Sequence, residues 1–101
     1  MINVIASIKI KESHMSEFIE IFKANMTNVL LETGCIEYVP TLDFATGFPV
    51  QELNSNVITI IEKWETLESL QAHLIAPHML EYKEKVRDIV ESVSLKVLEK
   101  V

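Results

Sequence analysis

The chain has 101 residues, of which 49% are hydrophobic and only two are glycine, a composition that predicts one packed domain over residues 1–101. A net charge of −6, with nine basic residues scattered along the chain, excludes a surface built to bind a nucleic-acid backbone. The chain has one cysteine, no long apolar stretch and no basic leader pattern, so we expect a cytoplasmic protein without a disulfide or a membrane span.

The first half of the chain predicts a strand, a helix and a second strand. Residues 2–10 alternate with period two and are rich in β-branched side chains, which is typical of a strand. Ser13 is expected to cap the helix that follows, and Gly34 is expected to end it in the left-handed conformation. Between them, apolar residues recur at three- and four-residue steps: Met15, Phe18, Ile19, Phe22, Met26, Val29 and Leu30.

Two further strands flank a long connection. Residues 35–42 predict a strand with Ile36, Tyr38 and Pro40 on one face, and the proline indicates an edge strand or a bulge. Residues 43–56 are longer than a tight hairpin needs, which is typical of a lid or a contact arm. Residues 57–65 are almost continuously apolar as far as Ile61, so we predict a central strand.

The end of the chain predicts two short helical segments and a last strand. Thr66 is a suitable N-cap, and Pro77 both interrupts that helix and opens the next one. Strand alternation in Val93, Leu95 and Val97 then finishes the chain. Before it, helical spacing is kept by Met79, Tyr82, Val86, Ile89, Val90 and Val93.

The order β-α-β-β-α-β predicts a ferredoxin-like α+β sandwich with an antiparallel sheet. Helices on one face would leave the other face uncovered, and we expect that face to carry Ile5, Glu62 and Trp64. An exposed apolar face needs a cover. We therefore predict a homodimer with a pocket between each sheet and the segments around it.

The segment from Glu62 to His78 gathers the residues best suited to chemistry. It holds the only tryptophan, Trp64, and two of the three histidines, His73 and His78. Glu62 and Trp64 share a face of a strand, so they would line one cavity if that face points inward. The break at Pro77 is expected to aim both histidines into the same space. An indole offers a flat surface for an aromatic ligand, and histidine moves protons near neutral pH.

Each of these residues also has a purely structural interpretation. Trp64 is equally explained as a core residue, and His78 as a residue that contacts backbone or solvent. Glu62 is explained by an ion pair with a lysine, and Tyr82, like Tyr38, by packing with a wet hydroxyl. These alternatives stay open at the level of sequence.

Other kinds of site find little support. A metal site drawn from Glu62, His73 and His78 matches no standard ligand spacing, so no metal is predicted. The chain has no glycine-rich phosphate loop and no arrangement typical of a serine or cysteine nucleophile.

Over nearly its whole length the chain resembles the antibiotic biosynthesis monooxygenase (ABM) family of small dimeric α/β-barrel proteins, which includes quinol monooxygenases. The resemblance rests on residues 4–9, on residues 32–38 and above all on Glu62-Lys-Trp64 followed by His73 and Ala76-Pro77-His78. The last block is the specific one.

The resemblance implies that a small aromatic molecule or quinol and dioxygen react without a metal, flavin or haem. It implies His73 or His78 as the catalytic base and Trp64 as a platform for the substrate ring. The other implied substrate contacts are Glu62, Tyr82, Phe18 and Phe22.

Two alternatives follow from relatives that share this fold. A haem-degrading branch uses an asparagine, a tryptophan and a histidine where this chain has Ile8, His73 and Lys83, and it therefore fits poorly. Another branch processes a signalling sugar. A non-catalytic dimer that binds a small hydrophobic molecule in a stress response is the alternative from a different class. A cavity lined by histidine and glutamate favours the enzyme, whereas a dry apolar interior with both histidines outside favours the binding protein.

Overall fold

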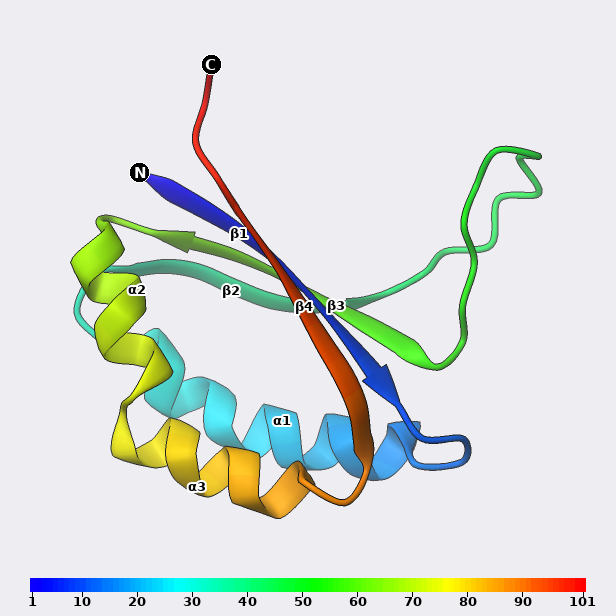
Figure 1. Ribbon diagram of the computed structural model, residues 1–101, viewed down its shortest axis with the longest axis horizontal. Helices are drawn as coiled ribbons and strands as arrows, with labels where there is room; N and C mark the ends of the chain where they lie inside the picture. Colours follow the sequence, from blue (N-terminus) through cyan, green and yellow to red (C-terminus); the bar gives the residue numbers. More distant parts are fainter.

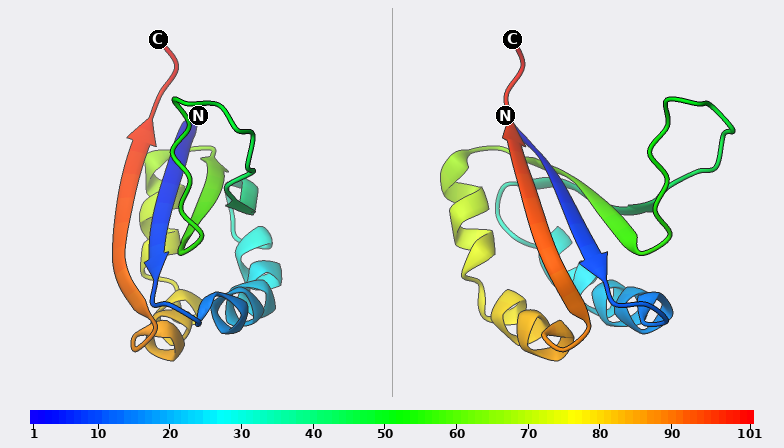
Figure 2. Two further views of the ribbon diagram at one scale, coloured as in Figure 1. Left: turned by 90° about the vertical axis from the view of Figure 1, so that its right-hand side faces the viewer. Right: turned by 45° about the vertical axis from the view of Figure 1, so that its right-hand side comes forward.

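Four antiparallel strands form one sheet, and the helices cover one of its faces (Figures 1 and 2). The computed structural model describes residues 1–101. None of its helices has the length and apolar character needed to cross a membrane. The elements are β1 (Ile2–Ile10), α1 (Met15–Leu30), β2 (Cys35–Leu42), β3 (Val57–Trp64), α2 (Leu67–Leu74), α3 (Pro77–Val86) and β4 (Val90–Leu98).

The strand order β2-β3-β1-β4 confirms the ferredoxin-like α+β fold. Strand β3 lies between β2 and β1, so the prediction of a central strand from residue 57 is confirmed, although it ends at Trp64. Strand β2 is at the edge of the sheet, which is where a proline such as Pro40 is tolerated within a strand. The irregularity of β2 lies between Cys35 and Glu37 instead of at the proline, and it leaves Ile36 42% exposed.

The register of the sheet decides which face carries the candidate residues. Glu62 pairs with Val4 and Ile5 pairs with Ile61, and these two pairs lie on opposite faces. Ile5 lies on the uncovered face, as expected. The prediction that Glu62 and Trp64 also lie there is wrong, because their register puts them on the helix-covered face, where they are 6% and 0% exposed.

An aromatic cluster fixes how α1 and α3 sit against the sheet. The ring of Phe22 stacks on Tyr38, with centroids 5.3 Å apart, and meets Tyr82 edge-on at 6.0 Å. Phe18 lies 6.2 Å from Tyr82, also edge-on. Such pairs prefer these two geometries. Phe18 and Phe22 belong to α1, so the cluster ties Tyr38 of β2 and Tyr82 of α3 to that helix.

The ends of the helices follow the sequence signals only in part. The Thr66 side chain accepts a hydrogen bond from Ser69 N–H at 3.1 Å, and Pro77 opens α3, as predicted. Ser13 does not cap α1: it has φ +70°, and His14 takes the cap position without a side-chain hydrogen bond. The predicted helical spacing through Val93 is wrong beyond α3: the chain turns after Val86, where Ile89 N–H donates to Val86 O at 3.0 Å, and β4 begins at Val90.

The connection between β2 and β3 extends away from the sheet and the helices (Figures 1 and 2). Side-chain hydrogen bonds hold its shape, including Gln51 Nε2 to Phe44 O at 2.6 Å and Asn54 N–H to Asp43 Oδ2 at 2.8 Å. Phe44 is 81% exposed and Phe48 66%. The segment therefore does not cover the sheet of its own chain.

Gly34 is the position where the fold depends most clearly on the absence of a side chain. Its φ is +84°, and a β-carbon there would lie 2.6 Å from the β-carbon of Ser69 in the first turn of α2. Its carbonyl also accepts a hydrogen bond from Glu65 N–H at 2.9 Å. The junction after α1 is therefore packed directly against the start of α2.

We predict that Gly34→Ala destabilises the protein by at least about 1 kcal/mol more than Gly47→Ala, because overpacking is added to backbone strain. Gly47 is a matched control: its φ is +79°, but nothing lies within 4 Å of its added β-carbon. Urea unfolding of both variants measures the difference. Equal losses would show that the contact with Ser69 is unimportant.

Candidate functional site

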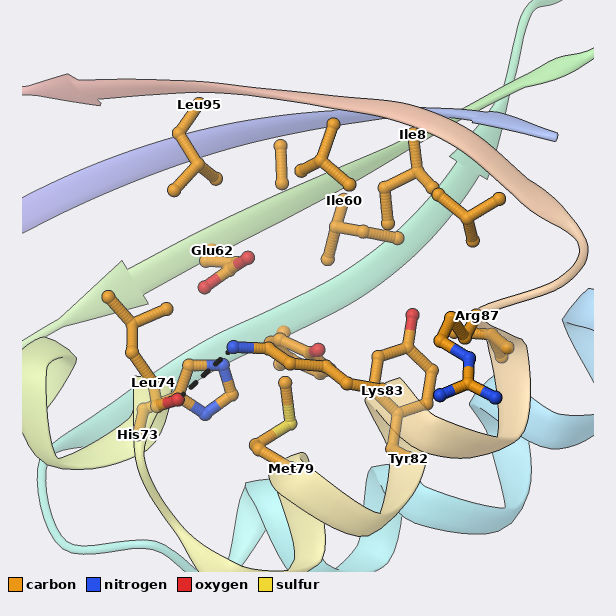
Figure 3. A pocket seen from close by; sticks show the side chains of 15 residues that line it. Ile8, Ile60, Glu62, His73, Leu74, Met79, Tyr82, Lys83, Arg87 and Leu95 are labelled. Carbon is orange, nitrogen blue, oxygen red and sulfur yellow. Dashed lines mark hydrogen bonds between the residues drawn. The ribbon is translucent and has the colours of Figure 1, made fainter.

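A cavity of about 490 Å³ lies between the helix-covered face of the sheet and helices α2 and α3 (Figure 3). Its volume is in the range of small-molecule sites. Eleven of its fifteen lining residues are hydrophobic, so the few polar groups stand out. The lining residues are Ala6, Ile8, Tyr38, Ile60, Glu62, His73, Leu74, Met79, Tyr82, Lys83, Val86, Arg87, Val90, Val93 and Leu95.

Glu62 is the carboxyl group of the cavity wall. Its Oε1 accepts a hydrogen bond from Trp64 Nε1 at 2.9 Å, and no protein group donates to its other oxygen. Burial raises the pKa of Glu62 to about 7; the indole hydrogen bond opposes this, and the charge of Glu32 adds to it. Near neutral pH this group can therefore both donate and accept a proton inside the cavity.

His73, at the end of α2, is the imidazole of the cavity wall. It is 2% exposed, its ring centroid lies 4.6 Å from that of Trp64, and it meets Tyr38 edge-on at 5.5 Å. Its Nδ1 lies 2.8 Å from Oε2 of Glu32. Burial lowers the pKa of His73, while the hydrogen bond and the charge of Glu32 oppose that shift.

His78 reaches the same carboxylate but does not line the cavity. Its Nε2 lies 2.9 Å from Oε2 of Glu32, the oxygen that His73 also contacts. Its ring borders a separate polar hollow of about 90 Å³ between α1 and α3, together with Asn25 and Asn28. The break at Pro77 therefore does bring both histidines to one place, but that place is Glu32 and not the cavity.

The predicted aromatic contacts are divided between the cavity and the core. Tyr82 lines the cavity, and its hydroxyl points toward the sheet in Figure 3. Trp64 is 0% exposed and lies behind His73 and Glu62, so its ring offers no free face to a ligand in this cavity. Phe18 and Phe22 are core residues beneath the two tyrosines.

Several residues of the site went unnoticed in the sequence. Tyr38, which its sequence pattern explains as a packing residue, lines the cavity. Burial raises the pKa of Tyr38 and of Tyr82, so both hydroxyls keep their protons. Lys83 lines the open side, where its Nζ donates to Leu74 O at 3.2 Å (Figure 3). Glu32 lies 41 residues from His73 and 46 from His78, a separation at which no local spacing signals a contact.

The candidate metal ligands Glu62, His73 and His78 do not form a common set. The structure contains no group of three or more His, Cys, Asp or Glu side chains arranged to hold a metal ion.

Comparison with known proteins places this geometry in a family. The model of the family described as antibiotic biosynthesis monooxygenase (ABM) matches residues 1–85. The chain is 35% identical to the probable quinol monooxygenase YgiN of Escherichia coli K12 over 101 residues, which cover 98% of this chain and 97% of that protein.

Solved structures show the same fold at lower identity. A conserved protein from Methanosarcina mazei Go1 has a TM-score of 0.84 and 23% identity, over 99% of this chain and 92% of that one. A protein from Nitrosomonas europaea has a TM-score of 0.85 and 17% identity, over 100% of this chain and 99% of that one. The match of the family model and the relative at 35% identity over nearly both chains establish the assignment. This chain belongs to the antibiotic biosynthesis monooxygenase family.

Proposed function

We propose that this protein is a monooxygenase that oxidises a small aromatic quinol with dioxygen, without a metal, flavin or haem. The observation that carries the proposal is that His73 and Glu62 line one cavity whose other walls are mostly apolar. Family membership and the identity to a probable quinol monooxygenase support it. A binding protein would need the apolar walls but not the two proton-transfer groups among them.

The reaction can be balanced with the substrate as its own reductant. A quinol and dioxygen give a hydroxyquinone and water, so one oxygen atom enters the ring and the other leaves as water. The quinol supplies all the electrons, and its hydroxyl protons and ring hydrogen supply those of the water and of the new hydroxyl. Removal of a phenolic proton makes an anion that can transfer an electron to dioxygen. The protein must bind the ring, accept that proton and limit access of water.

The cavity residues suit these tasks. His73, whose pKa is lowered by burial, is neutral at pH 7, and its Nε2 has no protein partner and can take the proton. Glu62 and the hydroxyls of Tyr38 and Tyr82 are hydrogen-bonding groups for the oxygen atoms of the substrate. The aliphatic side chains hold the ring and exclude water around it.

We also propose that two copies pack sheet to sheet as a dimeric barrel. The uncovered face of the sheet carries a cross-strand row formed by Val39, Ile61 and Ile5, in which Val39 is 42% and Ile61 40% exposed. Burying such a row against a second copy removes apolar surface from water. The cavities of the two copies would then lie on the two outer sides of the paired sheets.

The first prediction of this proposal concerns assembly. Ile61→Lys puts a charge in the centre of the proposed interface and should give a monomer of 11.5 kDa by light scattering, where the unchanged protein has twice that mass. Leu67→Lys is the control, since Leu67 is 49% exposed on α2, away from the sheet face. An unchanged protein of monomer mass would contradict the dimer.

The second prediction concerns activity. The protein should accelerate oxygen uptake by 1,4-dihydroxynaphthalene above its spontaneous oxidation. His73→Ala should lower kcat/KM at least tenfold, a loss of about 1.4 kcal/mol of transition-state stabilisation, because the cavity loses its base. Oxygen electrode measurements over a panel of quinols and polyphenols test this.

The control for activity is His14→Ala, because the side chain of His14 is 45% exposed and pairs only with Glu17. Uptake that is unaffected by His73→Ala would remove His73 as the base. Binding of the quinols without uptake would favour the non-catalytic binding protein.

The third prediction concerns Glu62 and pH. A carboxyl group with a folded-state pKa of about 7 and an ordinary pKa of 4.5 keeps its proton to a higher pH in the folded than in the unfolded state. The free energy of unfolding should therefore fall by roughly 3 kcal/mol between pH 4.5 and 7 through this group. Glu62→Gln removes the titration while keeping an acceptor for Trp64 Nε1.

Urea unfolding at pH 5 and pH 8 measures the effect of this substitution. At each pH, the free energy of unfolding of Glu62→Gln is compared with that of the unchanged protein. This difference should be more favourable to the variant at pH 8 than at pH 5. The contribution of His73 to the free energy of unfolding changes with pH in the opposite direction, since a histidine with a lowered pKa destabilises the fold only at low pH. His73 is present in both proteins, so its contribution cancels in the comparison. The same stability difference at both pH values would show that Glu62 does not titrate in this range.

A further inference from the structure

Three side chains from different parts of the chain meet behind the cavity wall. Oε2 of Glu32 lies 2.8 Å from His73 Nδ1 and 2.9 Å from His78 Nε2. The side chain of His73 is 3% exposed, that of Glu32 12% and that of His78 25%. The cluster therefore runs from the cavity wall to the surface, with the carboxylate in its centre.

The backbone around Glu32 holds the carboxylate in place. Glu32 lies just after α1, where its N–H donates to Val29 O at 3.0 Å and its own carbonyl accepts from Cys35 N–H at 3.2 Å. Gly34, two residues later, is packed against the start of α2. The side chain is therefore presented from a short turn with both of its backbone groups paired.

This geometry determines which nitrogen of His73 carries a proton. An ionised carboxylate can only accept hydrogen bonds, so a neutral His73 must bear its proton on Nδ1. Its Nε2 then carries the lone pair. That nitrogen makes no hydrogen bond within the protein, and the ring is part of the cavity wall.

We propose that Glu32 is the positioning residue of this site, because it holds His73 in the tautomer whose Nε2 accepts a proton from a molecule in the cavity. The proton leaves the substrate hydroxyl and binds to Nε2, and the resulting imidazolium keeps its Nδ1–H bond to the carboxylate. The choice of reaction rests on the proposed function, but the tautomer does not.

His78 has a different role in this arrangement. Its Nε2–H donates to the oxygen that His73 already uses, and its ring borders the separate hollow between α1 and α3 and does not line the cavity. A largely buried carboxylate is costly unless donors compensate it. His78 therefore supports Glu32 as the second donor and is not a base for the substrate.

The charges around His73 set the sign of the expected pH effect. Burial lowers the pKa of His73, the Glu32 hydrogen bond and charge raise it, and the charges of His78 and Lys83 lower it. Without the Glu32 charge, the pKa of His73 should therefore fall further. The titratable groups that face or approach this ring are Glu32, Tyr38, Glu62, His78 and Lys83.

The tautomer can be measured in the unchanged protein by NMR of histidine ring nitrogens. At pH 7, His73 should show a proton-bearing Nδ1 and a bare Nε2. His14 serves as an internal control, since it lies at the surface 3.5 Å from Glu17 and should sample both tautomers. A proton on Nε2 of His73 in the neutral ring would overturn the proposal. This experiment needs neither a substrate nor a variant.

Glu32→Gln tests whether the carboxylate beside His73 matters for catalysis. Its control is Glu17→Gln, which removes the carboxylate beside the exposed His14. The amide can donate to Nδ1 and so favours the opposite tautomer. We expect kcat/KM to fall at least tenfold, mainly through kcat, and the acid limb of its pH profile to move to lower pH. Glu17→Gln should leave both unchanged.

The outcomes separate this proposal from the proposed function. If no quinol is oxidised by the unchanged protein, the proposed function fails, while ring-nitrogen NMR of the Glu32→Gln variant still reports the tautomer and the pKa of His73. A folded Glu32→Gln variant with an unchanged tautomer and an unchanged His73 titration overturns the positioning role. If that variant does not fold, the measurement on the unchanged protein decides.

Discussion

The shared carboxylate of Glu32 is the interaction on which the site depends. It joins the turn after α1 to α2 through His73 and to α3 through His78, so two consecutive helices are fixed to one oxygen atom that lies 41 or more residues earlier in the chain. Gly34 makes this possible by letting the turn after α1 pack against the first turn of α2. The orientation of the imidazole in the cavity wall is therefore a property of the fold, and it does not require a bound ligand.

The apolar character of the cavity explains why its few polar groups are chemically useful. Burial raises the pKa of Glu62 to about 7 and lowers the pKa of His73, so the carboxyl group keeps its proton to a higher pH, and the imidazole stays neutral to a lower pH, than either would in water. Trp64 contributes from behind this wall: its Nε1 orients Glu62 and its ring packs against His73. An indole interpreted as a substrate platform is thus better described as support for the two groups that face the cavity.

Much of the fold could be predicted from local signals, and the errors have physical reasons. Thr66 and Pro77 marked their helix starts correctly, and Gly34 has the predicted left-handed conformation, although α1 already ends at Leu30. The face of Glu62 was missed, since a strand that is apolar on both sides shows little alternation and only its register reveals the inward residues. The role of Glu32 was missed because it depends on a contact between residues more than forty positions apart.

Incorporation of oxygen-18 from labelled dioxygen tests the central claim most directly. A monooxygenase that acts on 1,4-dihydroxynaphthalene should give a hydroxyquinone with one labelled oxygen atom, and the second labelled atom should appear in water. Simple oxidation would instead give the unlabelled quinone and labelled hydrogen peroxide. Mass spectrometry of the product distinguishes the two. A labelled hydroxyquinone that depends on His73 is the result we predict, and unlabelled quinone as the only product would contradict the account.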